Sequence, residues 1–280
     1  GRNLDWAGEE IPVVVETRPD RGRRFIQAGF TWNTGVFSGM NDAGLVLCTE
    51  RISTLGTPGL TGAPAEMVLR DLLQSTETFD SAVERLKARN HLRGYHVLVA
   101  GLDRKGVWRA ATLEYGNSIV VTEAQEGLLL GADPDRDSLT EDTGVRYRRA
   151  GALLEKETVV SAEAIQRILS DTELGRSGTE RILNPLTRHS VVFAPKALTL
   201  HVAIPGPDGS MGPYQSFTIE AGDATGEAME DLAQETRPAQ APKAPLQRAV
   251  RNAGNDSPEY SEADLLGPPI EAGQQGGGHS

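Results

Sequence analysis

The chain has very little cysteine: Cys48 is the only one among 280 residues, so it can form neither an intramolecular disulfide nor a zinc site built from several cysteines. It also lacks any run of 18 or more apolar residues, and its mean hydropathy is -0.34, so we expect no membrane span. Three signatures are absent: the Gly-x-Ser-x-Gly of serine hydrolases, the Gly-x-x-x-x-Gly-Lys phosphate loop and His-Glu-x-x-His. We therefore expect no metal ion and no cofactor.

Positive charge is scarce as well, with 28 Lys and Arg against 39 Asp and Glu and a net charge of -11. This balance argues against a nucleic-acid partner. Ala, Pro, Gly, Gln and acidic residues dominate 221–280, where Tyr260 is the only aromatic residue. Such a composition cannot bury enough apolar surface to fold. We expect one folded domain over residues 1–220 and a disordered acidic tail over 221–280.

Strand-like and helix-like segments alternate within residues 1–220. Short aromatic and β-branched runs separated by glycine and by Asn-Asp turns predict strands. The expected strands are 11–15, 25–32, 35–40, 45–48, 95–100, 107–114, 118–121, 127–130, 190–193 and 198–204.

Apolar residues spaced three and four apart predict two pairs of helices between the sets of strands. The expected helices are 64–74, one after Thr78, one over 146–156 and one after Ser161. On the first helix, Met67, Val68 and Leu72 are expected to fall on one side, and Leu69 and Leu73 are further candidates for that side. Composition alone would indicate only an α+β fold, but this order of elements is compatible with a four-layer αββα sandwich.

Residues 1–6, Gly-Arg-Asn-Leu-Asp-Trp, place an Arg, an Asn and an Asp close together. The group resembles the polar machinery of an N-terminal-nucleophile hydrolase. In such enzymes the first side chain attacks an amide or ester carbonyl, and the α-amine, whose pKa is about 7.7–8.0, takes the proton. Gly1 has no side chain to attack with. We therefore expect the nucleophile to lie upstream of Gly1.

The same six residues resemble the segment just downstream of the catalytic cysteine in choloylglycine hydrolases and the related isopenicillin N acyltransferase family. The likeness continues, in order, through residues 39–45, 69–73, 114 and 190–195. It implies an αββα enzyme that cleaves or transfers an acyl group at a non-peptide amide through a cysteine, with no cofactor. It also implies that this chain alone is inactive, because no residue in it matches the family's cysteine.

Three charged residues match family positions near the nucleophile. Arg2 and Asp5 would favour the thiolate and orient the α-amine, because a cation lowers a thiol pKa and a carboxylate accepts hydrogen bonds. The alternative is a solvated Arg and a capping Asp at a frayed end. Arg146 resembles a family arginine that reaches the nucleophile. Its alternative is the basic face of an amphipathic helix.

Two further residues are candidates for the oxyanion or substrate site. Asn3 is interpreted chiefly as a turn former, with donation to an oxyanion as the alternative. Asp133 stands in a segment, 130–134, where the family usually has a Thr-Asn pair that supplies an oxyanion donor. A carboxylate would oppose the negative charge that develops there, so either a backbone N–H replaces the donor or activity is changed or lost.

Cys48 and Glu114 are interpreted as structural. Cys48-Thr49 is similar to the Cys-Thr start of some family members, but Cys48 ends an apolar strand, and free cysteine is among the most buried residue types. Glu114 closes a strand before a turn, where a structural hydrogen bond is expected.

The hypothesis is an amidohydrolase or acyltransferase whose partner is a small-molecule N-acyl substrate. A catalytically inactive homologue that binds small molecules is the main alternative, and a serine or metal-dependent hydrolase is a weaker one. Bile-salt, penicillin-like, ceramide-like and other small N-acyl substrates stay open, as do water or an amine as acceptor. A homo-oligomer and the cellular compartment are also left open.

Overall fold

The computed structural model describes residues 1–51, 63–88, 94–115, 118–124, 129, 141–173 and 178–221. The chain divides into two units, Gly1–Arg237 and Pro238–Ser280, and the second lies outside the described residues. The expected domain boundary at residue 220 and the disordered tail therefore stay predictions. No helix in the described part is long and apolar enough to cross a membrane.

The observed elements follow the expected order of strands, helices, strands, helices and strands. The strands are β1 (Arg2–Asp5), β2 (Pro12–Thr17), β3 (Phe25–Phe30), β4 (Ser38–Asn41), β5 (Val46–Arg51), β6 (Tyr95–Leu102), β7 (Trp108–Tyr115), β8 (Ile119–Glu123), β9 (Thr187–Ala194), β10 (Thr199–Ala203) and β11 (Gln215–Thr218). The helices are α1 (Ala65–Ser75), α2 (Phe79–Ala88), α3 (Glu141–Leu154) and α4 (Ala162–Leu169).

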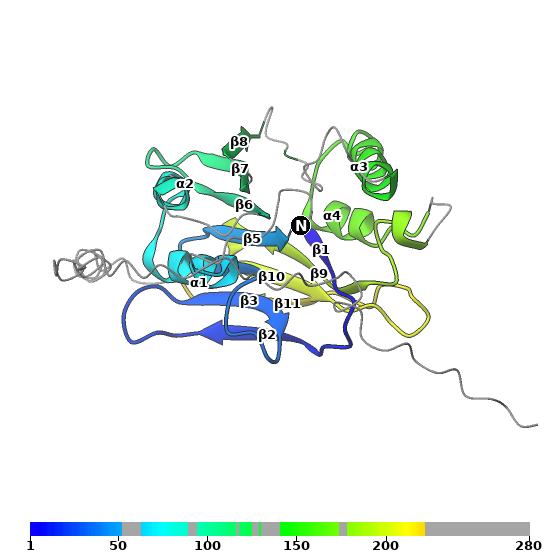
Figure 1. The fold of residues 1–280 in the computed structure, drawn as a ribbon, viewed down its shortest axis with the longest axis horizontal. Coiled ribbons are helices and arrows are strands. Elements are labelled where there is room, and N and C mark those ends of the chain that lie inside the picture. Colours follow the sequence, from blue (N-terminus) through cyan, green and yellow to red (C-terminus); the bar gives the residue numbers. More distant parts are fainter. Residues whose placement is uncertain are drawn as a thin grey trace, which may run out of the picture. The chain divides into compact units, whose positions relative to one another are not determined.

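The strands form two antiparallel sheets (Figure 1). The larger sheet has the order β2-β3-β4-β5-β6-β7-β8, so every pair of neighbours is also consecutive in the chain. The smaller sheet has the order β1-β9-β10-β11. Its first pair is non-local, because Arg2 of β1 lies opposite Val191 of β9. This pairing brings the start of the chain beside its last strands.

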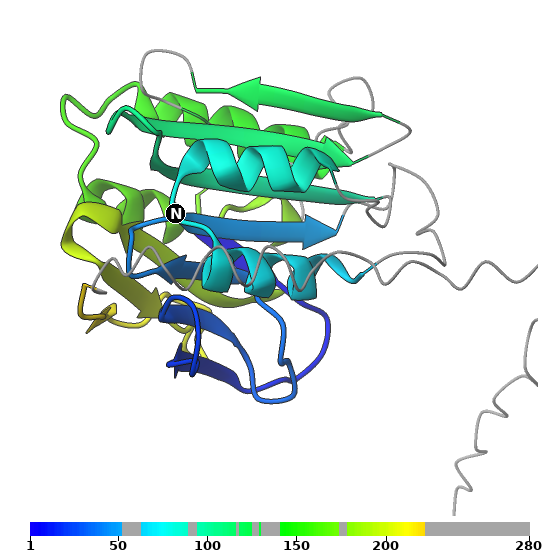
Figure 2. The ribbon, with the colours of Figure 1, turned by 90° about the vertical axis from the view of Figure 1, so that its left-hand side faces the viewer.

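Helices cover the outer faces of the two sheets. Alternation along β5 shows how the layers arise: Leu47 packs toward α1 and α2, whereas Val46 and Cys48 face the smaller sheet. Figure 2 shows α1 and α2 lying across the larger sheet. On the other side, α4 contacts β9, and Leu154 of α3 packs against Ile168 of α4. The expected αββα sandwich is therefore confirmed.

The two short helices with polar caps form as their sequences predict. Thr78 Oγ1 accepts a hydrogen bond from Ser81 N at 3.3 Å at the start of α2. Ser161 Oγ accepts one from Ala164 N at 3.2 Å at the start of α4. Each bond satisfies one of the backbone donors that a helix leaves free at its first turn.

Several local expectations were wrong. Met67 does not face the core but is 42 % exposed, because Val68, Leu69, Leu72 and Leu73 form the buried stripe of α1. The strands β1 and β11 were not expected: β1 pairs with the distant strand β9, and β11 pairs with β10, the strand that precedes it. The helix α3 begins at Glu141 and not near residue 146. Of the strand expected over 127–130, only Leu129 lies within the described residues.

The strand expected over 35–40 begins only at Ser38. A turn occupies the preceding residues: Gly35 N donates to Asn33 Oδ1 at 2.8 Å, and Val36 N donates to Glu66 O at 2.9 Å. The backbone donors of this stretch are thus used by a side chain and by α1, and not by a neighbouring strand.

The Asn-Asp turn after β4 is confirmed and fastens α1 to the larger sheet. The buried Asn41 amide donates to Leu73 O at 3.0 Å and to Thr76 O at 2.7 Å, at the end of α1. Its Oδ1 accepts from Ala43 N at 3.1 Å and from Leu45 N at 3.0 Å. All four hydrogen-bonding positions of the side chain are used, as a buried amide requires.

Candidate active site

Strand β1 carries the candidate site at the edge of the smaller sheet. Its backbone pairs with β9, and Leu4 is buried against Phe30 and Phe37 between the two sheets. The register shifts between Leu4 and Asp5. Such a bulge re-aims the side chains that follow it, and it lets Asp5 reach partners beyond the smaller sheet while it still borders a pocket.

Asp5 is held by three side chains from distant parts of the chain. Its Oδ2 accepts from Arg146 Nη1 at 2.8 Å and from Asn184 Nδ2 at 2.7 Å, and its Oδ1 accepts from Thr187 Oγ1 at 2.8 Å. Arg146 comes from α3, so the structure brings together two of the residues predicted from the sequence. The carboxylate has a fixed orientation and retains capacity for a further donor, since it can accept about four hydrogen bonds.

Arg2 reaches across to the larger sheet. Its Nη1 donates to the carbonyl oxygen of Thr49 at 2.6 Å and to that of Phe37 at 3.2 Å. Both acceptors are neutral carbonyl groups, so these two hydrogen bonds do not neutralise the positive charge of the Arg2 guanidinium. Arg2 lines two cavities.

Asn3 lies on the opposite side of β1. Its Nδ2 donates to Leu169 O and to Ile182 O, both at 2.9 Å, at the end of α4 and in the segment before β9. Asn3 is not in a turn, and it is not among the residues that line the adjacent pocket. The two bonds use both amide hydrogens to join the strand to the helix layer.

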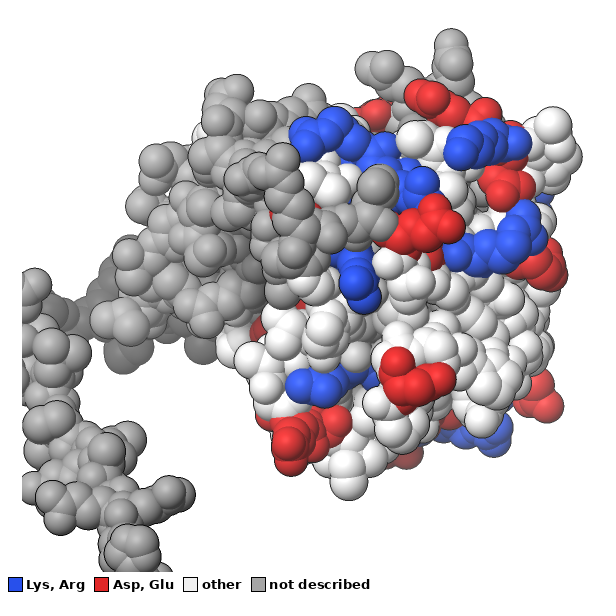
Figure 3. Space-filling view, turned by 90° about the vertical axis from the view of Figure 1, so that its right-hand side faces the viewer, with Lys and Arg blue, Asp and Glu red and all other residues white. Residues whose placement is uncertain are grey.

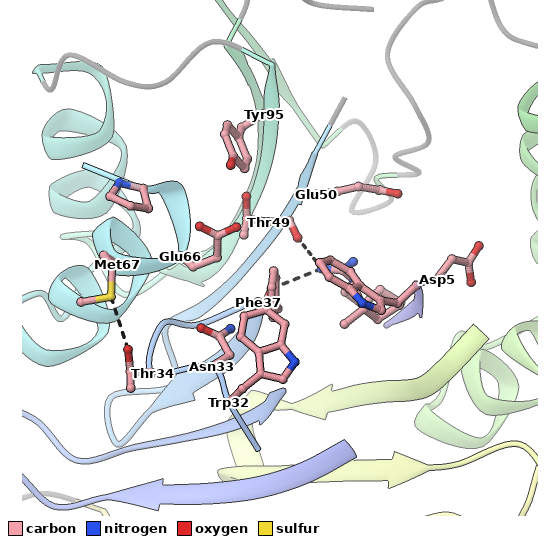
Figure 4. A pocket seen from close by; sticks show the side chains of 14 residues that line it. Asp5, Trp32, Asn33, Thr34, Phe37, Thr49, Glu50, Glu66, Met67 and Tyr95 are labelled. Carbon is pink, nitrogen blue, oxygen red and sulfur yellow. Dashed lines mark hydrogen bonds between the residues drawn. The ribbon is translucent and has the colours of Figure 1, made fainter. Parts of the chain in front are cut away.

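A pocket of about 530 Å³ opens beside Arg2 and Asp5 (Figure 4). One wall is aromatic: the Trp6 and Trp32 rings lie 5.9 Å apart, and the Trp6 and Phe37 rings lie 6.0 Å apart. The remaining lining residues are mostly polar and come from the β3–β4 connection, β5, α1 and β6. They are Asn33, Thr34, Thr49, Glu50, Pro64, Glu66, Met67 and Tyr95, together with Leu4.

The other cavity that Arg2 lines has a volume of about 230 Å³ and is also lined by Cys48 and His96. Burial raises the pKa of the Cys48 thiol, and the nearby Arg2 guanidinium offsets this only in part. Burial, with a smaller effect of Arg2, lowers the pKa of His96 to about 4. At neutral pH both groups are uncharged, so they do not form the thiolate and imidazolium pair of a cysteine nucleophile.

The helix layer beside the site carries charges of both signs. Arg149 pairs with Asp171 at 2.7 Å and with Glu173 at 2.8 Å, and Arg167 pairs with Glu157 at 3.0 Å. Figure 3 shows basic and acidic side chains interspersed on this side of the molecule. These helices therefore present no extended field of one sign.

Asn184 and Thr187 contact Asp5, but the sequence did not indicate them. Asn184 precedes a proline, and its Oδ1 accepts from Leu186 N at 2.8 Å, so an Asn-Pro turn just before β9 was the available signal. Trp6 was noted only as part of the opening segment, yet it forms part of the aromatic wall. Asp133 lies outside the described residues. Among those that are described, no three or more His, Cys, Asp or Glu residues are grouped to hold a metal ion.

Two stacked antiparallel sheets between helix layers, with this polar strand at the edge, define the fold of the N-terminal-nucleophile hydrolases. Residues 1–208 match the family model of acyl-coenzyme A:6-aminopenicillanic acid acyl-transferase. The chain belongs to this family, which confirms the resemblance noted in the sequence and relates the chain to hydrolase and acyltransferase enzymes.

Solved structures of similar fold include two hydrolases. The Caenorhabditis elegans ortholog of N-acylethanolamine-hydrolyzing acid amidase is 18 % identical with a TM-score of 0.51, over 69 % of this chain and 86 % of that one. A mutant conjugated bile acid hydrolase from Clostridium perfringens is 12 % identical with a TM-score of 0.52, over 78 % of this chain and 87 % of that one. No curated protein matches the sequence.

Proposed function

We propose that this chain is the body of an amidohydrolase or acyltransferase that acts on a non-peptide N-acyl bond through a cysteine acyl-enzyme. The cysteine would precede Gly1 in the full protein. The observation that carries the proposal is the arrangement at Asp5: a carboxylate anchored by Arg146, Asn184 and Thr187 borders a pocket of about 530 Å³. Three anchors on one side chain indicate a group whose position matters.

The chemistry assigned to the site uses protein side chains and the α-amine of the nucleophile. A thiolate attacks the carbonyl carbon of the N-acyl group, the C–N bond breaks, and the amine leaves with a proton, so that a thioester remains. Water or a second amine then attacks the thioester, the C–S bond breaks, and the thiol is restored. Arg2 would favour the thiolate, and Asp5 would orient the α-amine that relays the proton.

The pocket supports an N-acyl substrate with an apolar part. Trp6, Trp32 and Phe37 offer an apolar wall on which an acyl group can pack, while the polar residues opposite can meet an amide. The similar structures are named for hydrolysis of N-acylethanolamines and conjugated bile acids, which are small N-acyl molecules. The burial and raised pKa of Cys48 support a nucleophile elsewhere.

We assign Asn3 a positioning role, since its amide is engaged by two protein carbonyls.

A catalytically inactive homologue is the second candidate function. The observation that favours it is the sequence Ala132-Asp133 where the family usually has a Thr-Asn pair. Such a protein would keep the pocket and bind an N-acyl molecule without cleaving it.

The test starts with the protein purified from its native source. Its intact mass and N-terminal sequence should reveal a chain that begins with Cys upstream of Gly1. A thiol-directed probe should label that residue and spare Cys48, and N-acyl amides should release free acid or a transferred acyl product.

Asp5→Asn should lower kcat/KM by at least about 100-fold, because misplaced catalytic groups cost rates of this order. Asp208→Asn is the matched control, since Asp208 lies on an exposed turn and its Oδ1 accepts hydrogen bonds from Ser210. A native chain without a Cys, Ser or Thr at a processed terminus would overturn the catalytic proposal and favour the binding module.

A further inference from the structure

A second cavity, of about 360 Å³, lies between the two sheets. Val14 and Ala28 of the larger sheet form one wall, and Val202 and Phe217 of the smaller sheet form the other. Among the described residues, no Asp, Glu, Lys or Arg lines the cavity. It shares none of its lining residues with the pocket beside Asp5. The two are therefore separate sites.

His189 of β9 is among the residues that line this cavity. The residue is 0 % exposed, and neither Nδ1 nor Nε2 has a hydrogen-bond partner among the described residues. The ring packs edge-on against Phe30, with 5.7 Å between the ring centroids. A buried polar group without a partner is costly, so two such atoms on one side chain call for an explanation.

Phe30 and its neighbours separate His189 from the candidate active site. Phe30 contacts Trp6 at 5.6 Å and Phe37 at 6.0 Å between ring centroids, and both of these residues line the larger pocket. His189 thus lines the apolar cavity, and Phe30 lies between its ring and the aromatic residues of the larger pocket. The reaction assigned to Arg2 and Asp5 does not use it.

We propose that this cavity is a second ligand site, which takes a neutral aliphatic molecule of about twelve heavy atoms with one hydrogen-bonding group directed at His189. The size follows from the volume, since a water-sized group occupies about 30 Å³. Neutrality follows from the lining: a charged ligand would leave water for walls that offer no opposite charge.

The protonation state of the imidazole agrees with this choice. Burial, with a smaller effect of Arg2, lowers the pKa of His189 to about 3, so the ring is neutral at physiological pH. A neutral imidazole has one donor and one acceptor nitrogen, and a hydroxyl group can pair with either. A carboxylate gains no counter-ion from it. Aliphatic alcohols therefore fit the site better than fatty acids of the same chain length.

The experiment compares 1-decanol with decanoate on the 280-residue chain at about pH 7.5, by calorimetry and by NMR of the histidine rings. We expect 1-decanol to bind at least about tenfold more tightly than decanoate and to shift the ring resonances of His189. Equal binding of the two, or binding without a shift of His189, would overturn the proposal.

Two variants locate the site. His189→Phe keeps a ring of similar size without nitrogen atoms and should weaken 1-decanol binding at least about tenfold, which is the loss of one hydrogen bond of ordinary strength. His96→Phe, at a buried histidine in the other cavity, is the matched control and should leave the affinity unchanged. Ile204→Trp narrows the cavity at a half-exposed position and should also weaken binding. Unchanged affinity in both His189→Phe and Ile204→Trp would show that the cavity is no ligand site.

Discussion

Replacing His189 by Phe should remove part of the acid sensitivity of the fold. The folded chain holds the pKa of His189 at about 3, below its ordinary value of 6.5, because the imidazole is buried. Below pH 6.5 the unfolded chain binds a proton that the folded chain does not. The free energy of unfolding therefore falls as the pH drops from 6.5 toward 3, and above 6.5 this group adds no pH dependence.

The magnitude follows from the width of this window. One such group lowers the free energy of unfolding by about 1.4 kcal/mol for each pH unit below 6.5. At two units below 6.5 the loss is therefore about 2.7 kcal/mol. The wild-type chain should lose that much more stability than His189→Phe between about pH 7.5 and about pH 4.5. His96 and all carboxylates are present in both chains, so their effects cancel in the comparison.

Urea unfolding followed by circular dichroism at several pH values between these limits measures the difference. Val191→Ala is the control, since Val191 is fully buried near His189 in β9 and does not titrate. Its destabilisation should be the same at every pH. A pH dependence of His189→Phe equal to that of the wild type would refute the reasoning from burial.

Three further predictions concern the buried amide of Asn41, the Asp5–Arg146 ion pair and the thiol of Cys48. Asn41→Ala should lower the free energy of unfolding by about 3 kcal/mol, because four buried groups lose their partner, whereas Asn33→Ala should cost less than about 1 kcal/mol in the same urea assay. A double-mutant cycle of Asp5→Asn and Arg146→Met should return a coupling of about 1 kcal/mol; zero coupling would contradict the ion pair. Ellman's reagent should modify Cys48 only after unfolding, and fast reaction in the native state would contradict its burial.

Local patterns predicted the larger sheet and its helices well. Strands β2 to β8 pair with their neighbours in the chain, so apolar runs and turn residues such as Asn41 carry enough information to place them. The helix caps at Thr78 and Ser161 were also predicted, because a cap depends on residues only a few positions apart in the sequence. The prediction for Met67 was wrong because helical periodicity does not show where the buried face of α1 ends.

The site was harder to predict because its contacts are non-local. Arg2, Asp5 and Arg146 came from the family resemblance, and the structure joins Arg146 to Asp5. Nothing local marks Asn184 and Thr187 as partners of Asp5, because the strand pairing that brings them together spans most of the domain. For Asn3, the turn-forming preference of the residue was overridden by the pairing of β1 with β9.

The same pairing sets the order in which the protein can assemble. Strand β1 is synthesised long before its partner β9, which ends only at Ala194, so β1 must wait for most of the domain before it can pair. The larger sheet can form from successive hairpins in the meantime, since contacts between near neighbours in sequence form fastest. Closing so long a loop costs little extra free energy, because that cost grows only logarithmically with length. A nascent chain that stops before β9 would thus hold the larger sheet with α1 and α2, while β1, which carries Arg2 and Asp5, still has no partner strand.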